Sequence, residues 1–124
     1  MPLYVDGFLI PVPKKNIAAY RRLASAAGKV WRKLGALEFR ECVGDDLDGK
    51  GALSFHKSAK TKPGETVVFS WIVYRSRAHR DKVNAAVMKD PRILAMIAEM
   101  SDKKKSPFDP RKMAHGGFKV IVDA

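Results

Sequence analysis

Apolar and polar positions in the first third of the chain change from a strand-like pattern to a helix-like one and back. Residues 4–12 (YVDGFLIPV) alternate weakly and are rich in β-forming side chains, which predicts a strand that ends at Pro11 and Pro13. From 14 to 34 the apolar residues recur at intervals of three and four, which predicts one amphipathic helix carrying Ile17, Tyr20, Leu23, Ala24, Ala27, Val30, Trp31 and Leu34. Gly35 is suited to end this helix, and residues 36–43 (ALEFRECV) predict a second strand.

The rest of the chain repeats this order of strand and helix signals. Residues 44–65 predict a long polar connection, and residues 66–74 (TVVFSWIVY) predict a third strand. Ser76 is the expected N-cap of a helix to about Lys89, and Asp90 followed by proline predicts a short further helix through Met100. A loop then leads to a last strand at 116–124. The order is βαββαβ with an extra helix, which predicts an α+β protein: one ferredoxin-like domain over residues 1–124.

The third predicted strand is apolar on both faces. Val67, Phe69, Trp71 and Val73 lie on one face by the period of two, and Val68, Ile72 and Tyr74 lie on the other. Helices can cover only one face of a sheet, so the second face needs another cover. A second copy of the sheet, packed face to face, is the simplest cover, and the pattern therefore predicts a homodimer.

Composition narrows the class of protein. Of the 124 residues 46% are hydrophobic, and no apolar run approaches the roughly 18 residues that a membrane span needs. The start lacks the basic region and cleavage site of a secretory signal, and Cys42 has no second cysteine for an internal disulfide. We therefore expect a cytoplasmic protein of bacterial style with no membrane partner.

The net charge is +11, from 24 Lys and Arg against 13 Asp and Glu. Such a charge permits binding to nucleic acid or acidic surfaces. Much of it, however, lies in the runs KSAKTK (57–62) and SDKKKS (101–106), and charges scattered over loops are typical of a solvated surface. We expect no specific nucleic-acid partner, and at most weak, salt-sensitive and sequence-independent binding.

The stretch LYVDGF near the N-terminus is similar to the first-strand motif of RNA-recognition domains, which share the βαββαβ order. The third strand departs from that pattern at Val67 and Val68, where a basic residue and a glycine belong. In addition, Tyr4, Asp6 and Phe8 share one face, so a carboxylate would lie within the RNA platform and repel phosphate. RNA recognition is therefore the less favoured interpretation.

Residues suited to metal or nucleophilic chemistry lack the necessary spacing. DDLDG at 45–49 departs from a calcium loop at the first and twelfth ligand positions. The histidines, His56, His79 and His115, have no metal-site spacing. Cys42 lies in mid-strand, where we expect a small buried side chain rather than a nucleophile. We therefore expect no metal and no cofactor.

Four blocks are spread along nearly the whole chain: DGFLIPVPKKNIAAYRRLA, VWRKLGALEFRECVGDD, ETVVFSWIVYRSRAHRDKVNAAVMKDPR and GGFKVIVD. They resemble the YbaA-like family, a bacterial domain of unknown function. The resemblance implies a dimeric α+β barrel, in which two ferredoxin-like sheets pack together, and this agrees with the two apolar faces of the third strand. It implies no activity. Barrels of this class include monooxygenases, isomerases, haem-handling proteins and plain ligand binders, but a transfer of any of these would rest on fold analogy alone.

We expect a homodimer that holds a small organic molecule, either as a cofactor-independent enzyme or as a binding protein. A structural or partner-binding role is the alternative. The candidate catalytic residues are Asp6, in a central strand, and Glu41, which shares its face of the second strand with Leu37, Phe39 and Val43. A carboxylate in such surroundings must be paired, protonated or exposed to a wet cavity. The candidate ligand-binding residues are three aromatic side chains and two arginines suited to an anionic group: Tyr4, Trp31, Trp71, Arg75 and Arg80.

Two interpretations of the carboxylates stay open. A basic neighbour would make either of them a structural ion pair, and the expected partners are Arg40, Arg75 and Lys119. A carboxylate that lines a cavity would instead have a raised pKa and suit proton transfer. Of the two we favour Asp6 over Glu41, because Gly7 beside it leaves room for a ligand to approach the backbone.

Overall fold

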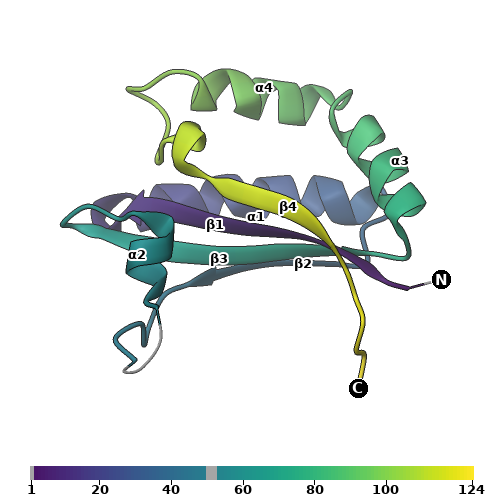
Figure 1. Cartoon of the computed structure of the whole chain (residues 1–124). Coiled ribbons are helices and arrows are strands. Elements are labelled where there is room, and N and C mark those ends of the chain that lie inside the picture. The colour runs from purple at the N-terminus through teal and green to yellow at the C-terminus, as the bar shows by residue number, and fades with distance from the viewer. Residues whose placement is uncertain (1, 50–52) are drawn as a thin grey trace.

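The structure is a computed structural model that describes residues 2–49 and 53–124, and its elements follow the predicted order (Figure 1). The strands are β1 (Tyr4–Pro13), β2 (Glu38–Val43), β3 (Glu65–Tyr74) and β4 (Ala114–Lys119). The helices are α1 (Ile17–Lys33), α2 (Phe55–Ala59), α3 (Arg77–Val87) and α4 (Pro91–Met100), with 3-10 turns at Lys14–Asn16 and Pro110–Lys112. The predicted α+β, ferredoxin-like fold is confirmed.

The four strands form one antiparallel sheet in the order β2-β3-β1-β4. Asp6 lies opposite Ile72 across β1 and β3, and Glu41 lies opposite Ser70 across β2 and β3. Since side chains alternate along a strand, this register brings both carboxylates to one face of the sheet. We call it the inner face, and it also carries Tyr4, Phe8, Ile10, Phe39, Val68, Tyr74 and His115.

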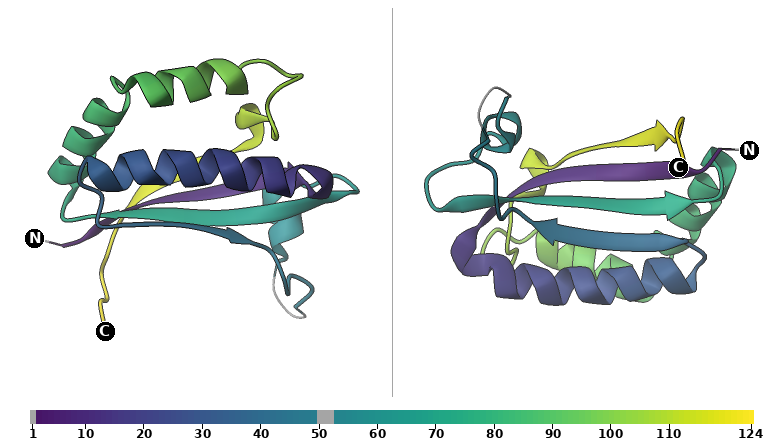
Figure 2. Two further views of the ribbon diagram at one scale, coloured as in Figure 1. Left: turned by 180° about the vertical axis from the view of Figure 1, so that it is seen from behind. Right: turned by 90° about the horizontal axis from the view of Figure 1, so that it is seen from below.

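Helices α1, α3 and α4 lie over the inner face, and α1 runs beside the edge strand β2 (Figures 1 and 2). Helix α4 packs against α1. One buried cluster lies near α3 and contains Val30, Ile72, Tyr74, Val83, Val87 and Ile93. A second lies toward the opposite end of the sheet and contains Ile10, Val12, Tyr20, Val68 and Phe108. Together these two clusters anchor the helices to the sheet.

Helix boundaries follow from local capping, as the sequence predicts. The hydroxyl of Ser76 accepts a hydrogen bond from the backbone N–H of His79 at 3.1 Å, and the carboxylate of Asp90 accepts one from that of Arg92 at 2.9 Å. Gly35 ends α1 with φ of +124°, a backbone conformation that favours glycine.

Two segments differ from the sequence-based prediction. The long connection at 44–65 contains the helix α2, whose N-cap, Ser54, accepts from the backbone N–H of Lys57; residues 50–52 of that connection lie outside the described part of the chain. One turn of helix is too short to show periodicity in sequence. The last strand begins earlier than predicted, at Ala114, and ends at Lys119, which pairs with Tyr4, the first residue of β1. Beyond it one backbone hydrogen bond joins the N–H of Val120 to the carbonyl of Leu3 at 3.0 Å.

We call the opposite face of the sheet the outer face. Among the described helices, α2 is the one that packs on it, against β3 and β1 (Figure 1). Three aromatic side chains form a row on the outer face: the ring centroids of Phe55 and Phe69 are 6.1 Å apart, and those of Phe69 and Trp71 are 5.6 Å apart. Phe69 is 47% exposed and Phe118, on β4, is 62% exposed. Cys42 lies on this face and is exposed, so its predicted burial is wrong; it belongs to an edge strand rather than a central one.

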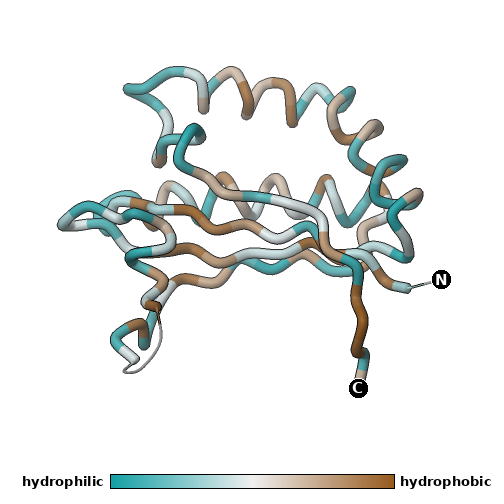
Figure 3. Tube along the Cα trace, viewed as in Figure 1, coloured by the Kyte–Doolittle hydropathy of each residue, from teal (hydrophilic) through white to brown (hydrophobic). Residues whose placement is uncertain are grey.

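Beyond β4 the chain leaves the sheet on the side of the outer face as a hydrophobic tail (Figures 1 and 3). Its residues Ile121 and Val122 are 89% and 78% exposed. Among the described helices, none combines the length and the apolar character that a bilayer crossing requires. The outer face and the tail are therefore the main apolar surfaces that a single chain leaves uncovered.

Candidate functional site

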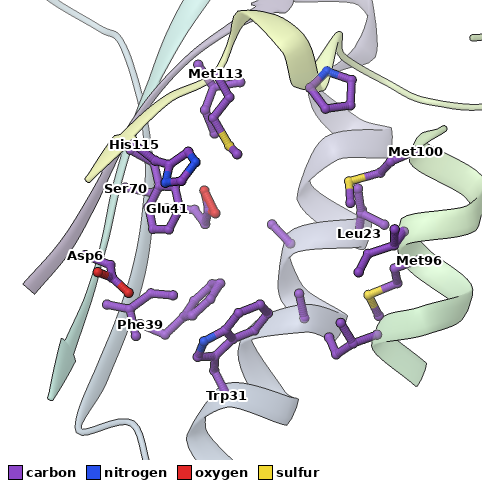
Figure 4. A pocket seen from close by; sticks show the side chains of 18 of the residues that line it. Asp6, Leu23, Trp31, Phe39, Glu41, Ser70, Met96, Met100, Met113 and His115 are labelled. Atoms are coloured by element: carbon purple, nitrogen blue, oxygen red, sulfur yellow. The ribbon is translucent and has the colours of Figure 1, made fainter. Parts of the chain in front are cut away.

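A cavity of about 590 Å³ lies between the inner face of the sheet and the helices α1 and α4 (Figure 4). We call it the inner cavity. Its size falls in the range of about 300–1,000 Å³ that is usual for small-molecule sites. Most of its lining is apolar, and the principal residues are Phe8, Ile10, Leu23, Trp31, Phe39, Ile72, Ile93, Met96, Met100, Phe108 and Met113.

Four methionines line this cavity: Met88, Met96, Met100 and Met113. Met96 and Met100 are one helical turn apart on α4, so both reach the same side, and Figure 4 shows them facing the sheet across the cavity. Unbranched, polarisable methionine side chains adapt to irregular apolar shapes. The lining therefore suits an apolar molecule without imposing a rigid outline on it.

At one end of the cavity, Asp6 is held by two side chains from α3. The guanidinium Nη1 of Arg80 donates to Asp6 Oδ1 at 2.8 Å, and the side-chain amide of Asn84 donates to Oδ2 at 3.3 Å. The Asp6 and Arg80 side chains are only 10% and 19% exposed. Arg80 also lies over the ring of Tyr4 at 4.9 Å and donates to Asp81. We call this group the Asp6 end. Asp6 is thus paired, and its partner is Arg80 instead of the expected Arg40, Arg75 or Lys119.

Asn84 joins the Asp6 end to the aromatic core. Its side-chain oxygen accepts hydrogen bonds from the indole N–H of Trp31 at 3.1 Å and from the hydroxyl of Tyr74 at 3.0 Å. Burial, and after it the charge of Asp6, raises the pKa of Tyr74 well above its usual value, so this phenol stays protonated. Every buried side-chain nitrogen and oxygen in the described residues has a partner. The Asp6 end is accordingly a satisfied network.

At the other end, which we call the Glu41 end, a carboxyl group has a phenol as its partner. The hydroxyl of Tyr20 donates to Glu41 Oε1 at 2.6 Å, and Oε2 lies 3.2 Å away. Within the described chain, no Lys or Arg nitrogen lies within 4 Å of this carboxylate. Burial raises the pKa of Glu41, and hydrogen bonds from Tyr20 and Ser70 oppose the rise. The pKa of Tyr20 is raised by burial first and then by the charge of Glu41.

The structure brings four of the seven predicted site residues to the inner cavity: Asp6, Trp31, Glu41 and Arg80. The other three lie elsewhere. Tyr4 is on the inner face beneath Arg80, Arg75 is exposed after β3, and Trp71 is on the outer face, where its indole N–H donates to Glu38 at 3.0 Å.

The sequence-based reason for preferring Asp6 to Glu41 does not hold. Gly7 faces away from the cavity, on the outer face, and a Cβ added to it would lie 3.3 Å from the ring of Phe118. The absence of a side chain at this position therefore accommodates a neighbouring phenylalanine on β4.

Several cavity residues escaped the sequence analysis, namely Tyr20, Ser70, Asn84, His115 and the methionines. For two of them, Ser70 and Asn84, the sequence contains a pattern that indicates a place in the site. Ser70 is a polar residue between buried apolar positions of β3, and Asn84 follows Arg80 by one helical turn on α3. Tyr20 falls within the apolar stripe of α1 and resembles an ordinary core residue. His115 lies on β4 and stacks on Phe8 with ring centroids 6.0 Å apart.

These groups offer acid–base and hydrogen-bond chemistry. Within residues 2–49 and 53–124, no three His, Cys, Asp or Glu side chains gather closely enough to hold a metal ion. The Asp6 end is internally neutralised by Arg80, whereas the Glu41 end presents a carboxyl group that gains or loses a proton without breaking an ion pair.

Solved structures with low sequence identity share this fold. A dimeric ferredoxin-like protein from an uncultured marine organism aligns over 100% of both chains with a TM-score of 0.57 and 14% identity. An uncharacterised NIPSNAP domain protein from Burkholderia xenovorans aligns over 98% of this chain and 94% of its own with a TM-score of 0.57 and 12% identity. Similarity at this level defines the class of protein, a ferredoxin-like α+β domain.

Sequence comparisons give the family. Residues 3–110 match the model of a family described as "Protein of unknown function (DUF1428)". The chain is also 38% identical over 120 residues to the uncharacterised protein YbaA of Escherichia coli K12, with 97% of each chain covered. This protein therefore belongs to the DUF1428 family, and the resemblance to YbaA-like proteins is confirmed.

Proposed function

We propose that this protein binds a small, largely apolar organic molecule in the inner cavity and exchanges a proton with it through Glu41. The observation that carries the proposal is the half-buried Glu41 carboxyl group, which lines an apolar cavity of about 590 Å³, has a raised pKa and has no basic partner among the described residues. Charged groups withdrawn from water are normally paired with a counter-ion, so a carboxyl group that faces a cavity with only neutral hydrogen-bond partners is a functional candidate.

The proposed step is acid–base and needs no redox partner. A ligand C–H or O–H gives its proton to a Glu41 oxygen, and the electron pair of the broken bond stays on the ligand. Return of the proton to another ligand atom completes an isomerisation. Burial favours this role because it moves the pKa of Glu41 upward, toward the operating pH. Tyr20 and Ser70 act as positioning residues, since their hydrogen bonds orient the carboxyl group.

Binding and proton exchange are tested separately. The neutral fluorophore N-phenyl-1-naphthylamine reports occupation of the cavity, and we expect Met96→Trp, which fills the cavity, to abolish the signal. Leu94→Trp is the matched control, because Leu94 lies on the same helix, is 51% exposed and does not line the cavity. Unchanged binding by the Met96→Trp variant would exclude the cavity as the site.

Proton exchange is followed by NMR as deuterium uptake from D₂O into an apolar β-diketone, 1-phenylbutane-1,3-dione. We expect the wild-type protein to accelerate uptake and Glu41→Gln to lose at least about 100-fold of that acceleration while it still binds the fluorophore. If Glu41→Gln exchanges as fast as wild type, the protein is a binding protein and not an acid–base catalyst.

The proposal also includes a homodimer formed through the outer face. Its support is the uncovered aromatic surface of Phe69, Trp71 and Phe118, since large apolar patches on soluble proteins mark interfaces. Sedimentation should show a dimer at micromolar concentration, and Phe118→Asp should produce monomers. Leu94→Asp, at an apolar site on α4 that is 51% exposed against 62% for Phe118, should leave the dimer intact. A wild-type protein that sediments only as a 13.8 kDa monomer at high concentration would refute the dimer.

A further inference from the structure

A second hollow, of about 750 Å³, runs between α1 and the edge strand β2. We call it the α1 groove. Its α1 side presents Arg21, Ser25, Lys29 and Arg32, which are separated by four, four and three residues and so form one stripe along the helix. Its β2 side includes Cys42 and Val43. Figure 2 shows α1 and β2, the two elements whose residues line this groove, running side by side.

The cationic side chains of the α1 groove form no ion pair within the described chain, although the charge of Arg32 acts on Glu38 from a longer distance. Within the described chain, no Asp or Glu oxygen lies within 4 Å of Arg21, Lys29 or Arg32. All three side chains are exposed, and Arg32 makes one hydrogen bond, to the carbonyl oxygen of Leu37. The groove is therefore a place where cationic side chains stay available for an anion, and the net charge of +11 attracts anions to the whole molecule.

The α1 groove and the inner cavity meet at shared walls. Four residues line both hollows: Tyr20, Ala24, Phe39 and Glu41. The 2.6 Å hydrogen bond between Tyr20 and Glu41 thus lies where an apolar cavity and a basic groove adjoin. Among the described residues that line the groove, Glu41 is the one that carries a carboxyl group. Burial raises the pKa of Glu41 and so favours its neutral form. Glu41 therefore repels a nearby anion less than an ordinary glutamate would.

We propose that the ligand of this protein is an amphipathic anion, with its apolar body in the inner cavity and a phosphate or carboxylate group in the α1 groove. This inference rests on the proposed function, because it assumes that the inner cavity binds the ligand. It adds the charge of the ligand and the orientation of its two ends. In this orientation the part of the ligand that joins body and headgroup lies beside Glu41, where a C–H of that part can give its proton to the carboxylate and keep the electron pair.

The test compares molecules with one chain length and different headgroups. Octyl phosphate, octanoate and 1-octanol compete with N-phenyl-1-naphthylamine for the wild-type protein at low salt. We expect at least one of the two anions to bind about tenfold more tightly than the alcohol, which corresponds to about 1.4 kcal/mol, because partly exposed ion pairs each contribute little. A larger advantage for octyl phosphate supports a phosphate headgroup, and a larger advantage for octanoate supports a carboxylate.

Matched variants locate the anion. Arg21→Gln/Lys29→Gln should remove most of the anion's advantage and leave the affinity for 1-octanol unchanged. The control Lys33→Gln/Arg77→Gln removes the same charge from exposed positions that line neither hollow and should preserve the advantage. Equal loss in both variants would attribute the effect to net charge and overturn the groove as the headgroup site.

The remaining outcomes separate this inference from the proposed function. If the alcohol and both anions bind equally, the amphipathic anion is excluded while ligand binding in the cavity stands. If the fluorophore does not bind to the wild-type protein, there is no ligand binding in the cavity. The proposed function then fails, and this inference fails with it.

Discussion

The two ends of the inner cavity each present a carboxylate from a β-strand, but they surround it with different partners. Asp6 accepts hydrogen bonds from the guanidinium of Arg80 and the amide of Asn84, and its side chain is 10% exposed. Glu41 accepts its shortest hydrogen bond from the phenol of Tyr20. A cation compensates a buried negative charge, whereas a neutral hydroxyl only orients it. We therefore infer that Asp6 stabilises the fold and that Glu41 is the group available for proton exchange.

The difference arises from which helix lies over each strand. Arg80 and Asn84 are one turn apart on α3, so both point at the same carboxylate of the central strand β1. Glu41 is on the edge strand β2 beside α1, whose inward stripe supplies Tyr20 while its basic residues lie in the groove. A central strand and an edge strand thus receive different chemistry from the same helical layer.

The largest predicted effect concerns the Asp6 end. Arg80→Ala should lower the free energy of unfolding by about 3 kcal/mol, because it leaves the Asp6 charge buried without its counter-ion. Urea denaturation at neutral pH measures this. Asp81→Ala removes the other, 62% exposed partner of Arg80 and should cost no more than about 0.5 kcal/mol. Equal, small losses in both variants would mean that the Asp6 pair is not structural.

A smaller effect is expected from the donor at the Glu41 end. Tyr20→Phe should cost about 1.5 kcal/mol, since it removes a hydrogen bond to an ionisable group. The Tyr20 hydrogen bond lowers the Glu41 pKa against the effect of burial, so its loss should raise that pKa further. Carbon-detected NMR titration of the Glu41 carboxyl group measures the shift. A pKa that falls in Tyr20→Phe would contradict the proposed role of the phenol.

The smallest effect on stability at neutral pH is expected from Glu41→Gln, about 1 kcal/mol or less, because the amide oxygen still accepts from Tyr20. The more informative measurement on this variant is how its stability depends on pH. Burial raises the Glu41 pKa in the folded state, so wild-type stability decreases as pH rises from the ordinary glutamate pKa through the folded pKa, and this decrease ends above it.

Glu41→Gln lacks the titrating group and should not show that decrease. Its stability relative to wild type should therefore increase across the same pH window, as measured by thermal unfolding at a series of pH values. Parallel curves for the two proteins would show that the Glu41 pKa is not raised in the folded state.

Local sequence information determined the helices and strands and, within each strand, which residues share a face of the sheet. The alternation of β1 placed Asp6 on the same face as Tyr4 and Phe8, and the alternation of β2 placed Glu41 with Phe39. The caps at Ser76 and Asp90 determined where α3 and α4 begin. These features depend on contacts within a few residues, so they are legible in the sequence.

Tertiary structure decided which carboxylate was paired and which aromatic residue reached the cavity. Asp6 and Arg80 are 74 positions apart, and Tyr20 and Glu41 are 21 apart. Trp31 and Trp71 are the same residue type and each lies among apolar neighbours, yet one lines the cavity and the other lies on the outer face. The choice depends on which sheet face the helices cover and on how each helix is rotated against it. Those variables are set by the packing of the whole domain, because no local pattern distinguishes one apolar face of β3 from the other.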